Sequence, residues 1–246
     1  MEPKKNIDFY GDQTRWFTGV VKSLNDPLEV GRIQVRIHGI HSDSQIDIPD
    51  DKLPWAQVVA PITEGGTNGL GNPLGIQPNA LVFGIFLDGP NSQLPLILGS
   101  LPKLEGDSET PSVNSLARGT NTITKTPDPV TDEPSSPYAA KYPNNKVTET
   151  TSGHVIEIDD TQDSDGNGNI THHERIHIFH RSGTFVEMHP NGDVVTHTAN
   201  GFKTVTGNEK IHVTKDMEIT ADGNINITST KGNINVKTPI GKINLN

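Results

Sequence analysis

The chain contains no cysteine, and this absence excludes disulfide bonds, thiolate catalysis and zinc sites with cysteine ligands. It also lacks the run of about 20 apolar residues that a membrane-spanning helix needs, so we do not expect an integral membrane protein. Apolar residues make up only 31% of the 246 residues, alongside 24 glycines and 18 prolines. Because this composition fills one modest core and not a large globule, we expect a small domain joined to something extended.

Basic residues are few as well: 20 Lys and Arg stand against 30 Asp and Glu, for a net charge of −10. A net negative charge repels the phosphate backbones of nucleic acids, and no cluster of basic residues offsets it. We therefore expect no nucleic-acid partner. The charged first residues are not followed by an apolar run, which argues against a secretory signal. We therefore expect synthesis in the cytoplasm.

Residues 14–102 contain short apolar or alternating runs separated by Gly, Pro, Asn and Asp, a pattern typical of closely spaced β-strands. Five such runs predict a small barrel. They are Trp16 to Lys22, Gly31 to Gly39, Trp55 to Ala60, Ala80 to Leu87 and Leu94 to Gly99.

The second of these runs alternates cleanly, which predicts that its apolar side chains point inward and its polar side chains outward. The inward set is Ile33, Val35 and Ile37, and the outward set is Arg32, Gln34 and Arg36.

Residues 103–150 are rich in proline and poor in large apolar side chains. Such a segment has too little apolar surface to offset the entropy of ordering it alone, so we predict an extended linker that drapes over a neighbour. Residues 1–13 are assigned to an N-terminal extension. Strand patterns return at residues 151–198, where we expect a β-hairpin collar with strands over 155–159, 175–180 and 185–189.

Residues 199–246 carry a repeat of apolar pairs in a two-residue step, and the last four pairs recur at intervals of eight, nine and nine residues. A single-chain β-solenoid needs roughly 18 or more residues per turn, whereas a unit of this length supplies one wall of a triangular prism. We therefore predict an intertwined homotrimer over a single-chain solenoid or a disordered tract, which the strict spacing disfavours. The pairs are Ile211/Val213, Met217/Ile219, Ile225/Ile227, Ile234/Val236 and Ile243/Leu245.

An ordered set of motifs runs along most of the chain, apart from part of the linker. In the first half the set is Trp16 to Val21, Asn25 to Leu28, Gly31 to Gly39, Leu53 to Trp55, Val82 to Asp88 and Leu96 to Gly99. In the second half it is Tyr142 to Asn145, Ser152 to Thr161, Glu174 to His180 and Ser182 to Thr184. This set resembles the central-spike proteins of contractile phages and the VgrG proteins of type VI secretion.

The resemblance implies an all-β fold: an N-terminal five-stranded OB-fold barrel, an extended linker and a C-terminal intertwined triple-stranded β-helix. It implies a trimeric spike in the tail baseplate of the virion, with a hub protein at the OB-fold end and a PAAR-like tip protein at the C-terminal end. Sheath contraction would drive the spike through the host envelope, in transient contact with the outer membrane. The alternatives are a VgrG-like spike of a type VI or extracellular contractile injection system, and a fibre-type adhesin.

The T-even-type member of this family carries a lysozyme domain between the OB-fold and the β-helix. Residues 103–150 are too few and too proline-rich for such a domain, since independent folds rarely fall below about 40 to 50 residues. We therefore predict no muramidase activity, no other enzymatic activity and no required cofactor. The large hub region that VgrG proteins carry before the OB-fold is also absent, which favours a phage with a separate hub protein.

The run from His173 to His177 matches the H-E-x-x-H signature of zinc proteases, which requires a helix so that both imidazoles converge on one zinc ion. The local period here is two, with Ile176 and Ile178 as an inward pair, so a strand is predicted. On a strand the two histidines lie about 13 Å apart, too far to share a metal within one chain. We interpret the run as a histidine-rich strand exterior, and expect most of the ten histidines to face solvent.

Residues 163–174 satisfy the pattern of an EF-hand calcium loop, with Gly168 at the sharp turn. The loop lies between predicted strands and not between helices, so the alternative is a polar hairpin tip. Our hypothesis is that Ca²⁺ locks this hairpin at the collar of the β-helix. The candidate ligands are Asp163, Asp165, Asn167, Asn169, Thr171 and Glu174.

The glycine-rich run from Gly65 to Gly71 has no following Lys-Ser/Thr pair and no helix pattern, so it is interpreted as a barrel loop and not as a phosphate site.

Overall fold

The computed structural model of the chain describes residues 14–67, 75–102 and 134–243. Contacts within the chain divide it into two units, residues 1–198 and residues 199–246. The predicted N-terminal extension and residues 103–133 of the predicted linker lie outside the described residues. Strands, turns and two short 3-10 helices make up the described part, which confirms the all-β fold class. No helix in that part has the length and apolar character that a membrane crossing requires.

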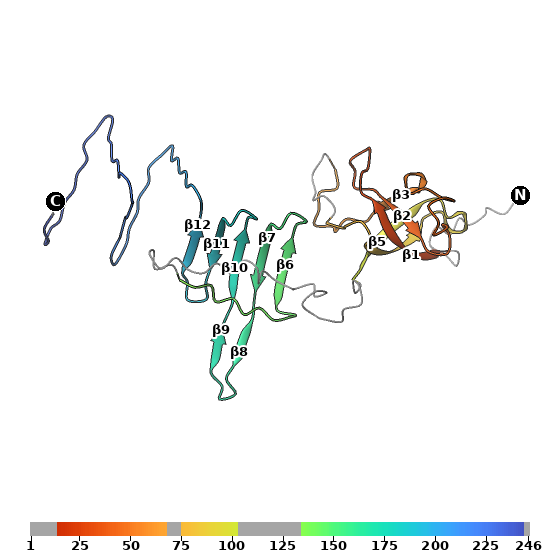
Figure 1. The fold of residues 1–246 in the computed structure, drawn as a ribbon, viewed down its shortest axis with the longest axis horizontal. Helices are drawn as coiled ribbons and strands as arrows, with labels where there is room; N and C mark the ends of the chain where they lie inside the picture. Colours follow the sequence, from red (N-terminus) through yellow and green to blue (C-terminus); the bar gives the residue numbers. More distant parts are fainter. Residues whose placement is uncertain (1–13, 68–74, 103–133, 244–246) are drawn as a thin grey trace, which may run out of the picture. The chain divides into compact units, whose positions relative to one another are not determined.

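The first five strands close into a barrel, as the spacing of the apolar runs predicts (Figure 1). Neighbours follow the order β1-β2-β3-β5-β4, and every pair is antiparallel except β3 with β5. The strands are β1 (Arg15–Ser23), β2 (Ile33–Ile37), β3 (Trp55–Val58), β4 (Leu81–Phe86) and β5 (Pro95–Leu101), with 3-10 helices η1 (Asp50–Lys52) and η2 (Gly89–Asn91). The barrel core contains Phe17, Val21, Ile33, Val35, Ile37, Ala56, Val82, Phe86 and Ile97.

The predicted outward side chains of β2 do not all reach solvent. Gln34 and Arg36 are each only 5% exposed. The amide of Gln34 donates to the carbonyl of Leu53 at 2.7 Å, and the guanidinium of Arg36 meets the carboxylate of Asp50 at 2.8 Å. The predicted alternation holds, but the loop before and through η1 supplies hydrogen-bond partners to the outside of this strand, so polar side chains are buried there.

Gly84 on β4 permits a close approach of neighbouring elements in the barrel. A Cβ atom added there would lie 2.3 Å from the carbonyl oxygen of Leu96 and 2.6 Å from the ring of Phe17. No side chain fits in this space, so glycine is required for β4 to pack against β1 and β5.

Five later strands form an antiparallel sheet in the order β12-β11-β10-β7-β6 (Figure 1). The three predicted strands correspond to β7 (Val155–Asp159), β10 (Arg175–Phe179) and β11 (Phe185–Met188), and β12 (Val194–His197) follows them. Edge strand β6 (Asn145–Glu149) falls inside the segment predicted as linker. That part of the prediction was wrong because one valine among polar residues gives no strand signal, whereas backbone pairing with β7 is enough to form one.

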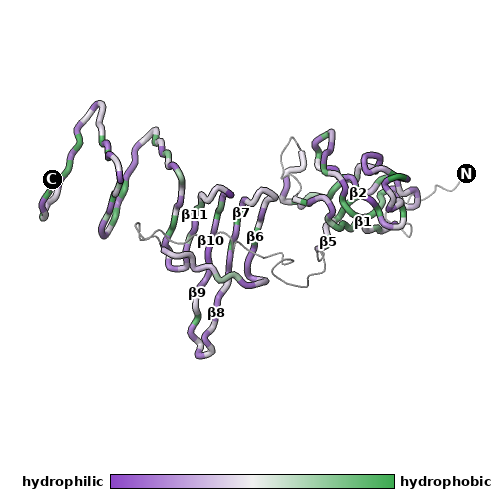
Figure 2. The backbone as a smooth tube through the Cα atoms, viewed as in Figure 1, coloured by the Kyte–Doolittle hydropathy of each residue, from purple (hydrophilic) through white to green (hydrophobic). Residues whose placement is uncertain are grey.

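Residues 199–243 contain no assigned strand in this single chain, and their side chains are exposed throughout. Figure 1 draws them as successive extended limbs joined by turns, and Figure 2 shows hydrophobic positions recurring along the limbs. The exposed apolar side chains include Ile211, Met217, Ile219, Ile225, Ile227, Ile234, Val236 and Ile243, which are 50–73% exposed. In isolation this segment buries neither its apolar groups nor its backbone, so the triple-stranded β-helix remains a prediction about the assembled protein.

Candidate assembly surface

The face of the sheet described here as the open apolar face carries aliphatic side chains on four neighbouring strands. Strand register places Ile158, Ile176, Met188 and Val194 in one row across β7, β10, β11 and β12. These four side chains are 41–61% exposed. Monomeric soluble proteins rarely leave such a continuous apolar surface in water, so this face is a candidate for assembly.

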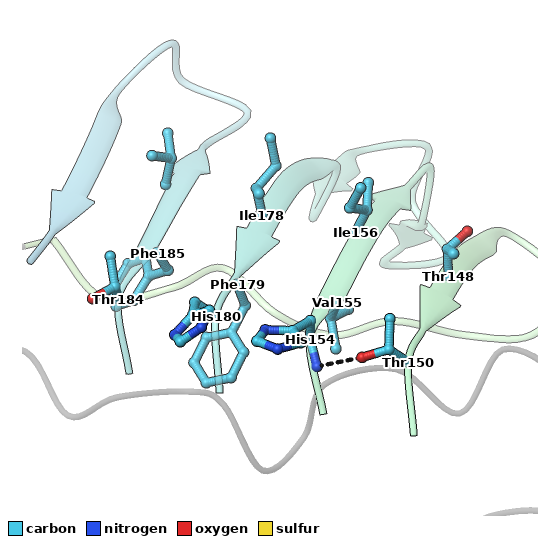
Figure 3. Close-up of a pocket in the computed structure, with 11 residues that line it drawn as sticks. Thr148, Thr150, His154, Val155, Ile156, Ile178, Phe179, His180, Thr184 and Phe185 are labelled. Atoms are coloured by element: carbon cyan, nitrogen blue, oxygen red, sulfur yellow. Dashed lines mark hydrogen bonds between the residues drawn. The ribbon is translucent and has the colours of Figure 1, made fainter. Parts of the chain in front are cut away.

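A second row on the same face contains Ile156, Ile178 and Val186. These side chains line a hollow of about 400 Å³ at one end of the sheet. Figure 3 shows Ile156 and Ile178 projecting to the same side of their strands, with the imidazoles of His154 and His180 close together near the strand ends. The hollow thus extends the open apolar face, and its lining is suited to receive other apolar side chains.

The opposite face of this sheet, called here the buried polar face, carries charged side chains that are closed off from solvent. Arg175 forms ion pairs with Glu157 at 2.6 Å and with Glu187 at 2.7 Å. His177 lies opposite both glutamates in the strand register, and all four side chains are at most 4% exposed. Pairing of this kind is what allows charged groups to be buried at all.

The structure corrects the expectation that the histidines alternating with Ile176 and Ile178 face solvent. His177 is 1% exposed, whereas Ile176 and Ile178 are 41% and 52% exposed in this chain. The reason is that the ion pairs of Arg175 and the ring of Tyr138 enclose the histidine side, whereas among the described residues the isoleucine side stays open. This arrangement was not inferred from the sequence, although Glu157, Arg175 and Glu187 also alternate with apolar residues and could have indicated a charged face.

The H-E-x-x-H run lies partly in β10, and no helix forms there, which agrees with the prediction of a strand. His173 lies 3.6 Å from the carboxylate of Asp163, whereas His177 is enclosed by the two glutamates of the buried polar face. The two imidazoles therefore have separate partners.

The predicted calcium loop forms a hairpin of β8 (Gln162–Ser164) and β9 (Ile170–His172). At its tip the carboxylate of Asp165 accepts backbone N–H bonds from Asn167 at 2.8 Å and from Asn169 at 3.2 Å. The structure thus brings these three candidate ligands together. The hydrogen bonds are also those of an ordinary polar turn.

The remaining candidate ligands of that loop have other partners. Asp163 lies opposite Thr171 in the ladder and forms an ion pair with Lys141. The carboxylate of Glu174 lies 2.9 Å from Nδ1 of His172. Within the described part of the chain no group of three or more His, Cys, Asp or Glu is arranged to hold a metal ion. The calcium site stays a prediction, and binding would require Asp163 and Glu174 to exchange partners.

Neighbouring groups keep the acidic candidates ionised. The ammonium of Lys141 lowers the pKa of Asp163, and the side-chain hydrogen bond from Asn169 lowers the pKa of Asp165. The hydrogen bond with His172 lowers the pKa of Glu174 to about 2. All three carboxylates are charged at neutral pH, which is the state that Ca²⁺ binds.

The glycine-rich run lies only partly within the described residues, since 68–74 fall outside them.

Comparison with known proteins gives one family and two relatives. The family described as "Gp5 N-terminal OB domain" matches residues 37–163, just over half of the chain. Protein Gp5 of Vibrio phage KVP40 is 30% identical over 280 aligned positions, which cover 86% of this chain and 64% of that protein. The pre-baseplate central spike protein Gp5 of Enterobacteria phage T4 is 36% identical over 88 residues, which cover 33% of this chain and 15% of that protein.

The chain thus spans less than two thirds of each relative's length. The alignment with the Vibrio phage protein is longer than the 246-residue chain itself, so that protein has residues with no counterpart here. The family match runs from the last residue of β2 into β8, and the barrel described above supplies the closed OB-type topology. The chain belongs to the family of proteins with the Gp5 N-terminal OB domain.

Proposed function

We propose that this protein is the structural central spike of a contractile phage tail, placed in the baseplate of the virion and assembled as a homotrimer. The observation that supports it most directly is the open apolar face, where Ile158, Ile176 and Met188 are left 41–43% exposed in a single chain. Residues 199–243 expose apolar pairs in the same way. Both surfaces would become buried if three chains wound together, since hydrophobic burial drives association.

The working parts of the spike follow the domain division expected from the sequence. Residues 14–102 would attach to a baseplate hub protein, residues 103–150 would link, and residues 151–198 would form a collar. Residues 199–246 would form the rod, with a PAAR-like tip protein at its C-terminal end. Sheath contraction would drive the assembly through the host envelope, in transient contact with the outer membrane. The name of the phage T4 relative, a pre-baseplate central spike protein, supports this role.

The proposed role needs mechanical stiffness and no catalytic site. Hydrogen bonds between chains and a dry apolar interior would give a rod that transmits axial force without buckling. We therefore propose that the chain has no muramidase activity. A zymogram on peptidoglycan that shows clearing by the purified protein would contradict this part of the proposal.

A VgrG-like spike of a type VI or extracellular contractile injection system is the second candidate. Such a spike would also be a trimer with a rod. The two candidates therefore differ in the injection system that carries the spike, and not in the structure of the spike itself.

The mass of the purified protein in solution tests the assembly. We expect three times the 26.6 kDa of one chain, measured by light scattering during size-exclusion chromatography. A mass of one chain at micromolar concentration would overturn the proposal, because the open apolar face would then have no partner copy.

A further inference from the structure

Residues 136–141 lie against the buried polar face of the sheet and are called here the strap. Ser136 accepts a hydrogen bond from Nη1 of Arg175 at 2.8 Å, and the ring of Tyr138 lies 4.2 Å from the guanidinium carbon of the same arginine. Burial raises the pKa of Tyr138, and the charge of Glu157 raises it further. The strap therefore contacts β10, the central strand of the sheet.

Three further contacts fasten the strap outside the sheet. The carbonyl of Pro137 lies 3.2 Å from Nδ1 of His173, and the backbone N–H of Lys141 donates to Oγ1 of Thr161 at 3.0 Å. The ammonium of Lys141 forms an ion pair with Asp163 on β8. The strap is thus held from its first residue to its last by residues that follow β7.

Residues 142–144 connect the strap to β6, and among the described strands β6 pairs only with β7. An edge strand is hydrogen-bonded to a neighbour on one side alone. When the segment that leads into it moves, the edge strand is therefore the first strand to separate from the sheet. A pull on a strand from its end breaks its hydrogen bonds one after another. The contacts of the strap lie upstream of β6 and attach to β10, β8 and the turn after β7, so a pull on the preceding chain reaches them before it reaches the edge.

We propose that the strap is an anchor that isolates edge strand β6 from movement of the chain that precedes it. Arg175 is its main attachment, because the two glutamates hold the guanidinium rigidly while its remaining surfaces receive Ser136 and Tyr138. The inference rests on the proposed function only for the source of the force, which would be the sheath-driven movement of the barrel end. The anchoring itself is a property of this chain.

Hydrogen–deuterium exchange of the full-length protein tests the anchor. The double variant Ser136→Ala/Tyr138→Ala removes two contacts of the strap and leaves the ion pairs of the sheet intact. We expect exchange over residues 145–149 to become about tenfold faster, while exchange over residues 175–179 stays at the parent rate. Lys146→Ala is the matched control, since it removes an exposed ion pair of β6 itself, with Asp160, and should change exchange little.

Two results would overturn the anchor. Unchanged exchange over residues 145–149 in the double variant would mean that the strap does not hold the edge. Equal acceleration over residues 145–149 and 175–179 would mean that the strap contributes to the stability of the sheet as a whole and does not isolate β6. Neither result depends on the mass measured in solution, so a failure of the anchor and a failure of the trimer are distinguishable.

Discussion

The carboxylate of Asp26 lies 2.7 Å from Nη2 of Arg32 and closes the loop between β1 and β2. The same carboxylate accepts backbone N–H bonds from Leu28 at 3.0 Å, from Val30 at 3.0 Å and from Arg32 at 3.1 Å. The hydrogen bond with Arg32 holds the pKa of Asp26 well below its usual range. The Asp26 side chain thus holds the loop together, and its negative charge strengthens the hydrogen bonds that the loop N–H groups donate to it.

Replacement of Asp26 by Asn should destabilise the barrel in a pH-dependent way. Because the folded pKa is depressed, the charge stabilises the fold above the unfolded value of about 3.9, and this stabilisation is lost as the pH falls toward the folded value. We expect Asp26→Asn to melt below the parent at neutral pH, with a difference that shrinks below about pH 4. Thermal melts across this range measure it, with exposed Asp51→Asn as control. A difference that stays constant with pH would contradict the role of the charge.

Gly84→Ala should weaken the barrel because the added Cβ would meet the carbonyl of Leu96, which is backbone and cannot turn aside. We expect a loss of about 2 kcal/mol or more in the free energy of unfolding, measured by denaturant titration. Gly99→Ala is the matched control, since no atom lies within 4 Å of a Cβ added there. Equal stability of the two variants would show that β4 can shift without loss.

Ile176→Lys should block assembly if the open apolar face joins copies of the chain. A lysine in the middle of the row would place an unpaired charge in an interface from which water is excluded, and this is costly. We therefore expect the mass in solution to fall below that of the trimer. Ile170→Lys on the β8–β9 hairpin is the control, because Ile170 is 55% exposed but lies outside the sheet. Retention of the full trimer by Ile176→Lys would exclude this face from the interface.

The calcium hypothesis predicts uptake of one ion per chain by the hairpin of residues 163–174. Calorimetric titration of the purified protein measures it, and Asp163→Ala should abolish the heat and the accompanying gain in thermal stability. Lys141→Ala should strengthen binding, since it frees Asp163 from its ion pair. No calcium uptake by the parent, with Asp163→Ala unchanged in stability, would reject the site.

The barrel strands could be predicted from the sequence because each strand buries one side. Apolar residues then occur at every second position, and this alternation can be seen in the sequence. Ile33, Val35 and Ile37 are at most 1% exposed, as expected. The burial of Gln34 and Arg36 could not be predicted, because it depends on carbonyls of a loop that is distant in sequence. Alternation predicts that neighbouring side chains lie on opposite sides of a strand. Which other residues cover each side depends on the fold.

The same limit explains the reversed assignment at β10. Ile176 and His177 alternate as predicted, but the alternation does not reveal that a strap some forty residues upstream, near Tyr138, meets the polar side. The candidate calcium ligands illustrate a different limit. Their spacing matches a loop pattern, whereas the orientation of Asp163 and Glu174 depends on Lys141 and His172, which compete for them.

Residues 199–243 form no strand within one chain, and this has a kinetic consequence for the proposed trimeric spike. If three copies fold this segment together, as proposed, no folded monomer of the segment exists, and its formation depends steeply on chain concentration. Newly synthesised chains would then hold an ordered barrel beside an unpaired tail. The rate of spike formation in an infected cell would be set by encounters between those tails.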